Sequence, residues 1–274
     1  MTSEFYQFFW PILKKDFLAV LTLSLDSGSL PHSFRRAIIT LLPKKGDLAD
    51  ISNWRPVSLL NTDYKIFAKL LAGRLKQCIG CVVDKDQSYC VPGRSLYHNI
   101  NLIRDVIFFA NVEDIPLAIL NLDQKKAFDN VDHGYLFNIM KSMGFGDRFI
   151  SYIQSLYEGA ESLIKVCGSL TTPFSFKKGI RQGCPLSGLL YTIAIEPFLI
   201  ALRKTLLDSA LCIPGTDKMC IVSAYADDVS IFITSDVGFA LVEEAYAIFS
   251  RASAACLNTK KVPGFMCRPV ERAK

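Results

Sequence analysis

A pair of adjacent carboxylates between two apolar runs constrains the fold of this chain more than any other feature. The run Met219–Ala224 leads into Tyr225-Ala226-Asp227-Asp228, and the run Val229–Thr234 leads out. Two short apolar runs joined by a tight polar link predict a β-hairpin. Adjacent carboxylates at its tip repel each other unless a cation lies between them. A surface Asp-Asp turn is the competing interpretation, and on this segment alone it is the favoured one.

A third carboxylate changes that interpretation. Leu117–Leu122 is a short apolar run of the buried-strand type, and Asp123 follows it directly. A strand that delivers one Asp beside a hairpin that delivers two can hold two metal ions, which lie roughly 3.5–4 Å apart in such sites. Hard cations such as Mg²⁺ prefer oxygen ligands. The three carboxylates therefore predict a two-metal site for phosphoryl transfer, where positioning and charge neutralisation carry most of the catalysis.

The remaining pattern predicts an α+β fold, because helical and strand-like segments do not alternate regularly. Apolar residues at helical spacing predict helices over 4–25, with Pro11 near its start, and over 62–82, 97–110, 133–143, 147–158, 186–207 and 238–255. Further strands are expected over 37–42, 162–166 and 174–177. Residues 53–56 are expected to be irregular, because Trp54 and Arg55 lead into Pro56.

Composition excludes a disordered chain but says little about partners. The chain has 274 residues, of which 50% are hydrophobic and 21% charged, with a formal net charge of +5. This mild basic excess permits a polyanionic partner without requiring one. The apolar start is broken by Lys14, Lys15 and Asp16, and the longest apolar run, Leu189–Leu202, is too short to span a bilayer. We expect a soluble intracellular protein, with the choice between nucleus and cytoplasm left open.

The nine cysteines do not predict a disulfide framework, because their number is odd and their spacing irregular. Cys78 and Cys81 form the one close pair. A single pair without a partner pair is a weak zinc signal. Two small hydrophobic residues near a helix end are the favoured interpretation.

Segments along nearly the whole chain, from about Ser3 to Lys261, resemble the reverse transcriptases of non-LTR (LINE-type) retrotransposons. The finger segments of that family are matched by Leu42-Pro43-Lys44-Lys45-Gly46, Asn53-Trp54-Arg55-Pro56-Val57-Ser58-Leu59-Leu60, Tyr64-Lys65-Ile66, Leu71-Ala72-Gly73-Arg74-Leu75, Asp86-Gln87-Ser88-Tyr89, Gly93-Arg94-Ser95 and Asn99-Ile100. Its motifs A to D are matched by Asp123–Asp129, Gly179–Ser187, Tyr225–Asp228 and Leu257-Asn258 with Lys260-Lys261. Each motif is moderately specific, and their common order is very specific.

The resemblance implies the fingers and palm of a right-hand polymerase, with a small antiparallel sheet packed on helices. It implies that residues 1–110 form an N-terminal helix and fingers, 111–134 palm, 135–178 a fingers–palm connection and 179–274 palm. The implied activity is RNA-directed DNA polymerisation, which adds dNTPs to a DNA primer on an RNA template with Mg²⁺ as cofactor and Mn²⁺ as the alternative. The oligomeric state is left open.

The resemblance also assigns residue roles. Asp123 and Asp227 ligate the metals, with Asp228 beside them. Lys44 and Arg55 hold the incoming triphosphate, Arg55 through its planar fork. A solvated turn lysine is the alternative for Lys44, and its neighbour Lys45 could take the role instead. A structural salt bridge is the alternative for Arg55.

Further roles concern the nascent base pair. Gln182 and Gly183 approach it and the template, although a plain loop before a helix is the alternative. Tyr225 contacts substrate. Phe128 lies where the family places a bulky ring under the sugar, which disfavours a 2′-hydroxyl; a core phenylalanine is the alternative. Lys261 protonates the leaving pyrophosphate, with Lys260 and a solvated lysine as alternatives.

The chain departs from the family in length, because full-length members carry an endonuclease before this region and a thumb and a cysteine-rich segment after it. We expect a fragment or truncated descendant that lacks a thumb. A catalytically inactive remnant that at most binds nucleic acid is therefore the alternative function. Phe128 and the Tyr-Ala-Asp-Asp tip argue against an RNA polymerase, and the finger segments fit retrotransposons better than intron maturases.

Overall fold

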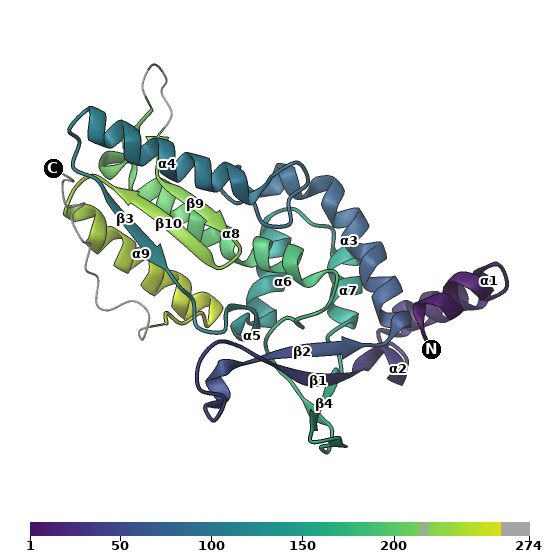
Figure 1. The fold of residues 1–274 in the computed structure, drawn as a ribbon. Helices are drawn as coiled ribbons and strands as arrows, with labels where there is room; N and C mark the ends of the chain where they lie inside the picture. Colours follow the sequence, from purple (N-terminus) through teal and green to yellow (C-terminus); the bar gives the residue numbers. More distant parts are fainter. Residues whose placement is uncertain (214, 216–218, 259–274) are drawn as a thin grey trace. The chain divides into compact units, whose positions relative to one another are not determined.

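The computed structural model describes residues 1–213, 215 and 219–258 (Figure 1). The chain forms two compact units, each built from two stretches of sequence. The first comprises Met1–Leu75 and Met140–Ser187, and the second comprises Lys76–Ile139 and the described residues from Gly188 onward. Helices and small antiparallel or mixed sheets occur in both units, so the predicted α+β class is confirmed.

The first unit contains a mixed sheet in the order β2-β1-β4-β5, with β6 also paired to β4. Strand β1 is antiparallel to β2 and parallel to β4. The strands are β1 (Arg36–Pro43), β2 (Trp54–Leu60), β4 (Glu161–Val166), β5 (Ser169–Leu170) and β6 (Phe174–Ser175). The predicted strand over 162–166 is confirmed, whereas the one over 174–177 covers two residues only.

Strand β2 corrects the prediction that residues 53–56 are irregular. Trp54 opens the strand, and Pro56 lies opposite Leu41 of β1. Ser58 donates its N–H away from β1, to the Gln182 carbonyl oxygen at 2.8 Å. Backbone N–H directions alternate along a strand, so the nitrogen of Pro56 also faces away from β1. A proline is tolerated there because β2 is an edge strand and its missing donor interrupts no ladder bond.

Three helical segments of the first unit follow the predicted apolar spacing: α1 (Ser3–Ser27), the start of α3 (Thr62–Val82) and α7 (Asp147–Ser155). The short helix α2 (His32–Arg35) and the 3₁₀ turn η1 (Ile51–Asn53) were not predicted. Tyr64, Phe67, Leu71 and Leu75 of α3 are buried at intervals of three or four residues, as an amphipathic helix requires. Pro11 lies inside α1 rather than near its start, and the helix continues through it to the left-handed cap at Gly28.

The second unit contains an antiparallel sheet in the order β3-β10-β9. Its strands are β3 (Ala118–Leu122), β9 (Val222–Tyr225) and β10 (Asp228–Ile233); β7 (Leu211–Cys212) and β8 (Met219–Cys220) form a separate pair. The predicted strand 219–224 is thus divided between β8 and β9. The predicted hairpin of β9 and β10 is confirmed.

The second unit also contains helices. They are α4 (Leu96–Val112), α5 (Ala127–Asn130), α6 (His133–Ser142), α8 (Ser187–Thr205), the 3₁₀ turn η2 (Leu207–Ser209) and α9 (Val237–Ser253). Figure 1 shows α4 alongside β9, and Val106 of α4 joins a buried cluster with Phe232 of β10. Phe198 of α8 stacks on Phe249 of α9 with centroids 5.1 Å apart. Helices α3 and α6 each cross the boundary between the two units.

None of the helices in the described residues is long and apolar enough to cross a bilayer. Cys78 and Cys81 lie in the last turns of α3, as expected for residues near a helix end.

Candidate active site

The sheet of the second unit brings the predicted carboxylates to one end. Val229 of β10 lies opposite Leu122 of β3, and Asp228 lies opposite Tyr225 of β9. Extending the first register by one residue sets Asp123 opposite Asp228. Directly opposed residues of an antiparallel pair have Cβ atoms about 4.5–5.5 Å apart. The strand pairing therefore supplies the juxtaposition that sequence spacing alone could only suggest.

Asp123 is held by a segment that sequence reasoning did not assign to it. Asn258 donates from Nδ2 to Asp123 Oδ2 at 2.9 Å, and its backbone N–H donates to the Asp123 carbonyl oxygen at 2.9 Å. Lys125 donates its N–H to the Cys256 carbonyl oxygen at 2.8 Å. Residues 256–258 therefore run along 123–125, and Asn258 fixes one carboxylate oxygen of Asp123.

The donor chemistry of this sheet end suits a hard divalent cation, because the carboxylates offer oxygen ligands only. Among residues 1–213, 215 and 219–258, however, no three His, Cys, Asp or Glu side chains converge closely enough to hold a metal ion. Asp123 and Asp227 are half-buried and Asp228 is exposed. The strand register thus collects the three carboxylates at one sheet end without forming a closed ligand shell.

Phe128 lies in an aromatic cluster beside this sheet end. Its ring stacks on Tyr191 of α8, with centroids 4.6 Å apart and planes 17° apart. Tyr89 meets Phe128 edge-on at 6.5 Å and Tyr225 edge-on at 5.2 Å. Phe128 is half-buried, so one part of the ring stays accessible while its neighbours restrict its rotation. This placement fits a positioned ring better than a fully enclosed core phenylalanine.

Two of the three tyrosines in the cluster, Tyr191 and Tyr89, have raised pKa values and stay protonated at neutral pH. Burial raises the pKa of Tyr191 well above its ordinary value, with the charge of Asp227 adding to the rise. Burial also raises the pKa of Tyr89 to about 12, with smaller contributions from Cys90 and others. Neither phenol is a candidate base, so their part in the site is packing.

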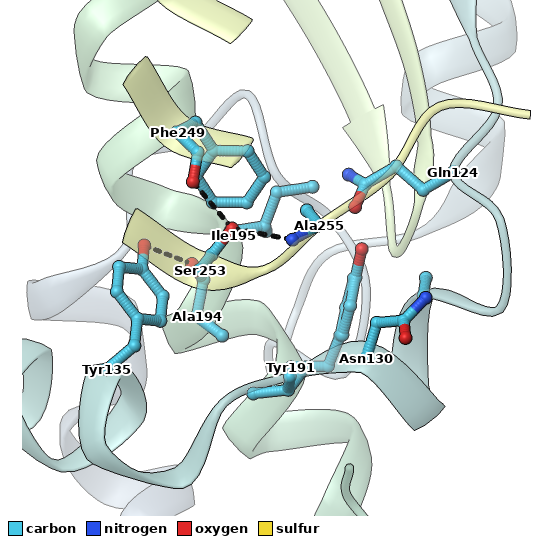
Figure 2. Close-up of a pocket in the computed structure, with 11 residues that line it drawn as sticks. Gln124, Asn130, Tyr135, Tyr191, Ala194, Ile195, Phe249, Ser253 and Ala255 are labelled. Atoms are coloured by element: carbon cyan, nitrogen blue, oxygen red, sulfur yellow. Dashed lines mark hydrogen bonds between the residues drawn. The ribbon is translucent and has the colours of Figure 1, made fainter. Parts of the chain in front are cut away.

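A small cavity of about 10 Å³ lies beneath the cluster, between α5, α6, α8 and α9. Figure 2 shows Gln124 and Tyr191 directed into it, with Tyr135 donating to the Ala194 carbonyl oxygen at 2.9 Å. The Gln124 amide nitrogen and the Tyr191 hydroxyl are buried without a hydrogen-bond partner among the described residues. Such a cavity has room for about one water molecule and none for a nucleotide, so the pocket belongs to the support of the site.

In the first unit, Lys44 and Arg55 lie on one face of the β1–β2 hairpin. Arg55 is opposite Leu42 and shares its face, and Lys44 is two residues from Leu42. The Lys44 N–H donates to the Asn53 carbonyl oxygen at 2.7 Å, so Lys44 continues the ladder. Both side chains are exposed, and neither forms an ion pair within the described part of the chain. The salt-bridge alternative for Arg55 therefore has no support there.

Gln182 and Gly183 lie against the outer edge of β2. Gly183 has φ 102°, and a Cβ there would approach the Ser58 carbonyl oxygen to 2.7 Å. Glycine is required by both the backbone conformation and this contact. The loop is anchored by buried Arg181, which donates to the Arg35 carbonyl oxygen at 2.7 Å and lies 5.0 Å from the ring of Phe176. Gly183 was expected to make a close backbone contact with the nascent pair and the template, and in the structure it makes such a contact with Ser58 of β2.

The predicted residues fall into two groups. Lys44, Lys45, Arg55, Gln182 and Gly183 belong to the first unit, whereas Asp123, Phe128, Tyr225, Asp227 and Asp228 belong to the second. Lys260 and Lys261, the candidates for the proton donor, lie outside the described residues.

Comparison with known proteins identifies the family of this chain. Residues 42–271 match the sequence model of the family described as reverse transcriptase (RNA-dependent DNA polymerase), and this chain belongs to that family. It is 49% identical, over 97% of its length, to the "Transposon TX1 uncharacterized 149 kDa protein" of Xenopus laevis, and covers 20% of that protein. It is 28% identical, over 87% of its length, to the "Retrovirus-related Pol polyprotein from type-1 retrotransposable element R2" of Popillia japonica, and covers 33% of it.

The similarity extends to solved structures at the level of the fold. The apo telomerase of Candida tropicalis superposes with a TM-score of 0.63 at 14% identity, covering 92% of this chain and 48% of that one. The Candida albicans telomerase in complex with a TWJ fragment of telomeric RNA gives 0.61 at 12% identity, covering 93% and 46%. This chain therefore spans between a fifth and a half of the proteins it resembles.

Proposed function

We propose that this chain is the reverse transcriptase domain of a non-LTR retrotransposon polyprotein, which adds dNTPs to a DNA primer on an RNA template. One observation carries the proposal: the β3–β10–β9 register sets Asp123 opposite the hairpin that bears Asp227 and Asp228. Family membership over residues 42–271 supports the same reaction. The names of the relatives support a retroelement origin, and the RNA bound by the Candida albicans telomerase supports an RNA template.

In this proposal, residues 1–110 and 135–178 contribute the fingers and their connection, and residues 111–134 and 179–274 form the palm. The β3–β10–β9 sheet with α8 and α9 is the part that we assign to the palm. Its antiparallel order and helical support are the features that favour this assignment. The mixed sheet around β1 and β2 is the part that we assign to the fingers.

Asp123, Asp227 and Asp228 are the proposed ligands of divalent metal ions, Mg²⁺ or Mn²⁺. Such ions, when bound, neutralise the charge that develops on the transferred phosphoryl group. The hydrogen bond from Asn258 to Asp123 Oδ2 restricts the rotation of the Asp123 carboxylate at the end of β3. Asp228 is the most exposed of the three, so we assign it to the solvent side of the site, beside the two main ligands Asp123 and Asp227.

The substrate contacts are proposed on charge and shape. Lys44 and Arg55 bind the triphosphate, because they are exposed cations on one face of the hairpin and have no ion pair within the described residues. Phe128 lies under the sugar and excludes a 2′-hydroxyl, which selects deoxynucleotides. Tyr225 and Gln182 are proposed to face the nascent pair, and Gly183 is proposed to support the same loop through its close backbone contact with β2. Lys261 is proposed to protonate the leaving pyrophosphate.

A second candidate function is a nucleic-acid-binding module that does not extend primers. The specific observation that favours it is the lack of three converging metal-ligating side chains among the described residues. A binding module retains the affinity for primer–template without any dependence on Asp227. The two candidate functions therefore differ in whether substitution of Asp227 changes primer extension.

Primer extension on an RNA template, with dNTPs and Mg²⁺, tests the proposal. The wild-type chain extends the primer, and Asp227→Asn abolishes extension while binding of labelled primer–template persists. Asp236→Asn, in the same unit but away from the sheet end, is the matched control and retains extension. Binding without extension by the wild-type chain would support the second candidate and contradict the first.

A further inference from the structure

The edge of β9 that does not pair with β10 is covered by a segment from a distant part of the sequence. The Ala224 N–H donates to the Asp86 carbonyl oxygen at 2.9 Å, and the Ser88 N–H donates to the Ala224 carbonyl oxygen at 3.0 Å. Asn99 adds a bond from Nδ2 to the same Ala224 oxygen at 2.9 Å. Residues 86–88 therefore run beside β9 and continue the sheet toward the Tyr225–Asp228 hairpin tip.

Within this segment, the side chain of Gln87 reaches the tip itself. Its Nε2 donates to the Ala226 carbonyl oxygen at 3.3 Å, and its Oε1 accepts the Ala226 N–H at 3.2 Å. Oε1 also accepts the Tyr89 N–H at 2.9 Å, so the amide has a single consistent orientation. Gln87 is fully buried and Ala226 is 6% exposed. The side chain thus pairs with both backbone polar groups of one residue, where water cannot replace it.

Ala226 has an unusual backbone conformation. Its φ is 56°, in the left-handed region that residues with a Cβ rarely adopt. Such conformations persist where surrounding contacts over-determine them, and they cluster at functional sites. The neighbouring residue in the chain is Asp227, so the direction of the Ala226 peptide decides where the Asp227 carboxylate is delivered.

The segment that carries Gln87 is itself fixed on both sides. Arg203 of α8 pairs with Asp86 at 3.3 Å and also bonds to Glu196. Arg94 donates to the Gln87 carbonyl oxygen at 2.8 Å and to the Val83 carbonyl oxygen at 3.0 Å. The amide of Gln87 is therefore held by a rigid segment rather than by a mobile loop.

We propose that Gln87 is a positioning residue: its two-sided hydrogen bond holds Ala226 in the left-handed conformation and so sets the position of the Asp227 carboxylate. This inference rests on the proposed role of Asp227 as a metal ligand. Gln87 does not touch substrate or metal in this account and acts through the Ala226 peptide. Its removal takes a hydrogen-bond partner from both backbone polar groups of Ala226 and from the Tyr89 N–H, which favours a rearranged tip.

Hydrogen exchange of the 274-residue chain tests the inference without requiring activity. Gln87→Met keeps the length of the side chain but loses both bonds to Ala226 and the bond to Tyr89. In this variant, amide exchange at Ala226 and Asp227 is expected to accelerate about tenfold or more. Asn99→Met is the matched control, because it removes a buried amide that bonds β9 at Ala224 but does not touch Ala226. It is expected to change exchange at the tip far less.

Ala226→Gly supplies the decisive second variant. Glycine adopts positive φ readily, so residue 226 would keep its left-handed conformation with less help from the hydrogen bonds of Gln87. Gln87→Met is expected to weaken the binding of Mn²⁺, which electron paramagnetic resonance of the bound ion measures. Adding Ala226→Gly to Gln87→Met is therefore expected to recover most of the lost Mn²⁺ affinity. Gln87→Asn, whose shorter amide cannot reach both Ala226 groups, replaces Gln87→Met if the latter does not fold.

Three outcomes separate the hypotheses. Unchanged exchange at the tip in Gln87→Met, equal acceleration in Asn99→Met, or no recovery with Ala226→Gly would each overturn the inference. If Asp227→Asn abolishes primer extension while Gln87→Met leaves exchange, Mn²⁺ affinity and extension at wild-type values, the inference fails and the proposed function stands. If Asp227→Asn still extends primers, the proposed function fails, whereas the exchange results still report on the clamp.

Discussion

The β3–β10–β9 sheet end and the β1–β2 hairpin hold their candidate residues by different means. At the sheet end, Asp123 is bonded by Asn258, and the hairpin tip is bonded by Gln87. On the β1–β2 hairpin, Lys44 and Arg55 are exposed and have no ion pair within the described residues. Asp123 and the hairpin tip are thus held by hydrogen bonds within the chain, whereas no ion pair among the described residues holds the side chains of Lys44 and Arg55.

This difference has a physical reason. A metal ligand contributes only if it is held close to its required position, so its supporting contacts carry functional weight. A cation that binds a polyphosphate acts over a longer range and tolerates mobility. Substitutions in the two regions should therefore differ in whether they change structure, substrate binding or selectivity.

The largest effect on folding is expected at Gly183, where the first unit does depend on an exact backbone fit. Gly183→Ala adds strain at φ 102° and a Cβ 2.7 Å from the Ser58 carbonyl oxygen. We expect it to lower the free energy of unfolding by about 2–4 kcal/mol. Gly168→Ala is the control, because its φ is 83° but its Cβ would meet nothing within 4 Å.

Chemical denaturation of both variants measures this prediction. Gly168→Ala is expected to cost about 1 kcal/mol, from backbone strain alone. Equal losses for the two variants would show that the contact with Ser58 contributes nothing, and the account of the Gln182–Gly183 loop would then be wrong.

The next effect concerns substrate binding by the exposed cations. Arg55→Ala is expected to raise the KM for dNTP about tenfold or more, because a charge-assisted bond to the triphosphate is lost. Stability should change by no more than about 0.5 kcal/mol, since the side chain is exposed. Steady-state primer extension and thermal unfolding measure the two quantities.

Lys177→Ala, another exposed cation of the first unit, is the control for Arg55 and should leave KM unchanged. Lys44→Ala and Lys45→Ala, compared separately, decide which of these neighbours meets the triphosphate. A KM for Arg55→Ala equal to that of the wild-type chain would contradict the proposed role of this hairpin.

The smallest effect is expected on sugar selectivity at Phe128. Phe128→Ala removes the ring under the sugar and should raise ribonucleotide incorporation, relative to dNTP, roughly tenfold. Tyr191→Leu, which removes the stacked partner at 4.6 Å, should cause part of that change. Tyr191→Phe keeps the stack and is the control. Competition between rNTPs and dNTPs gives the ratio, and unchanged discrimination in Phe128→Ala would refute the role.

Local sequence patterns predicted most elements of the fold, because apolar spacing and turn residues act over short distances. The helix over 62–82 and the β9–β10 hairpin are examples. The strand through Trp54 and Pro56 was missed because a proline signals irregular structure unless the strand is known to lie at a sheet edge. That information depends on the pairing of β1 with β2 and β4.

The carboxylates of the candidate site were predictable from the sequence, but the residues that hold them by hydrogen bonds were not. Asp123 and Asp227-Asp228 follow strand patterns that are visible in the sequence. Asn258 and Gln87 could not be assigned their roles, because their partners lie 135 and 139 residues away. The left-handed conformation of Ala226 could not be predicted either, because a residue with a Cβ ordinarily avoids this conformation.

Single-turnover incorporation of one dNTP on an RNA template, by the wild-type chain and Asp123→Asn, tests the central claim most directly. If β3 and the hairpin form one catalytic centre, Asp123→Asn slows incorporation at least about a hundredfold with little change in thermal unfolding. Asp208→Asn, an exposed carboxylate of the same unit, should react at the wild-type rate. Incorporation by Asp123→Asn at the wild-type rate would contradict the account.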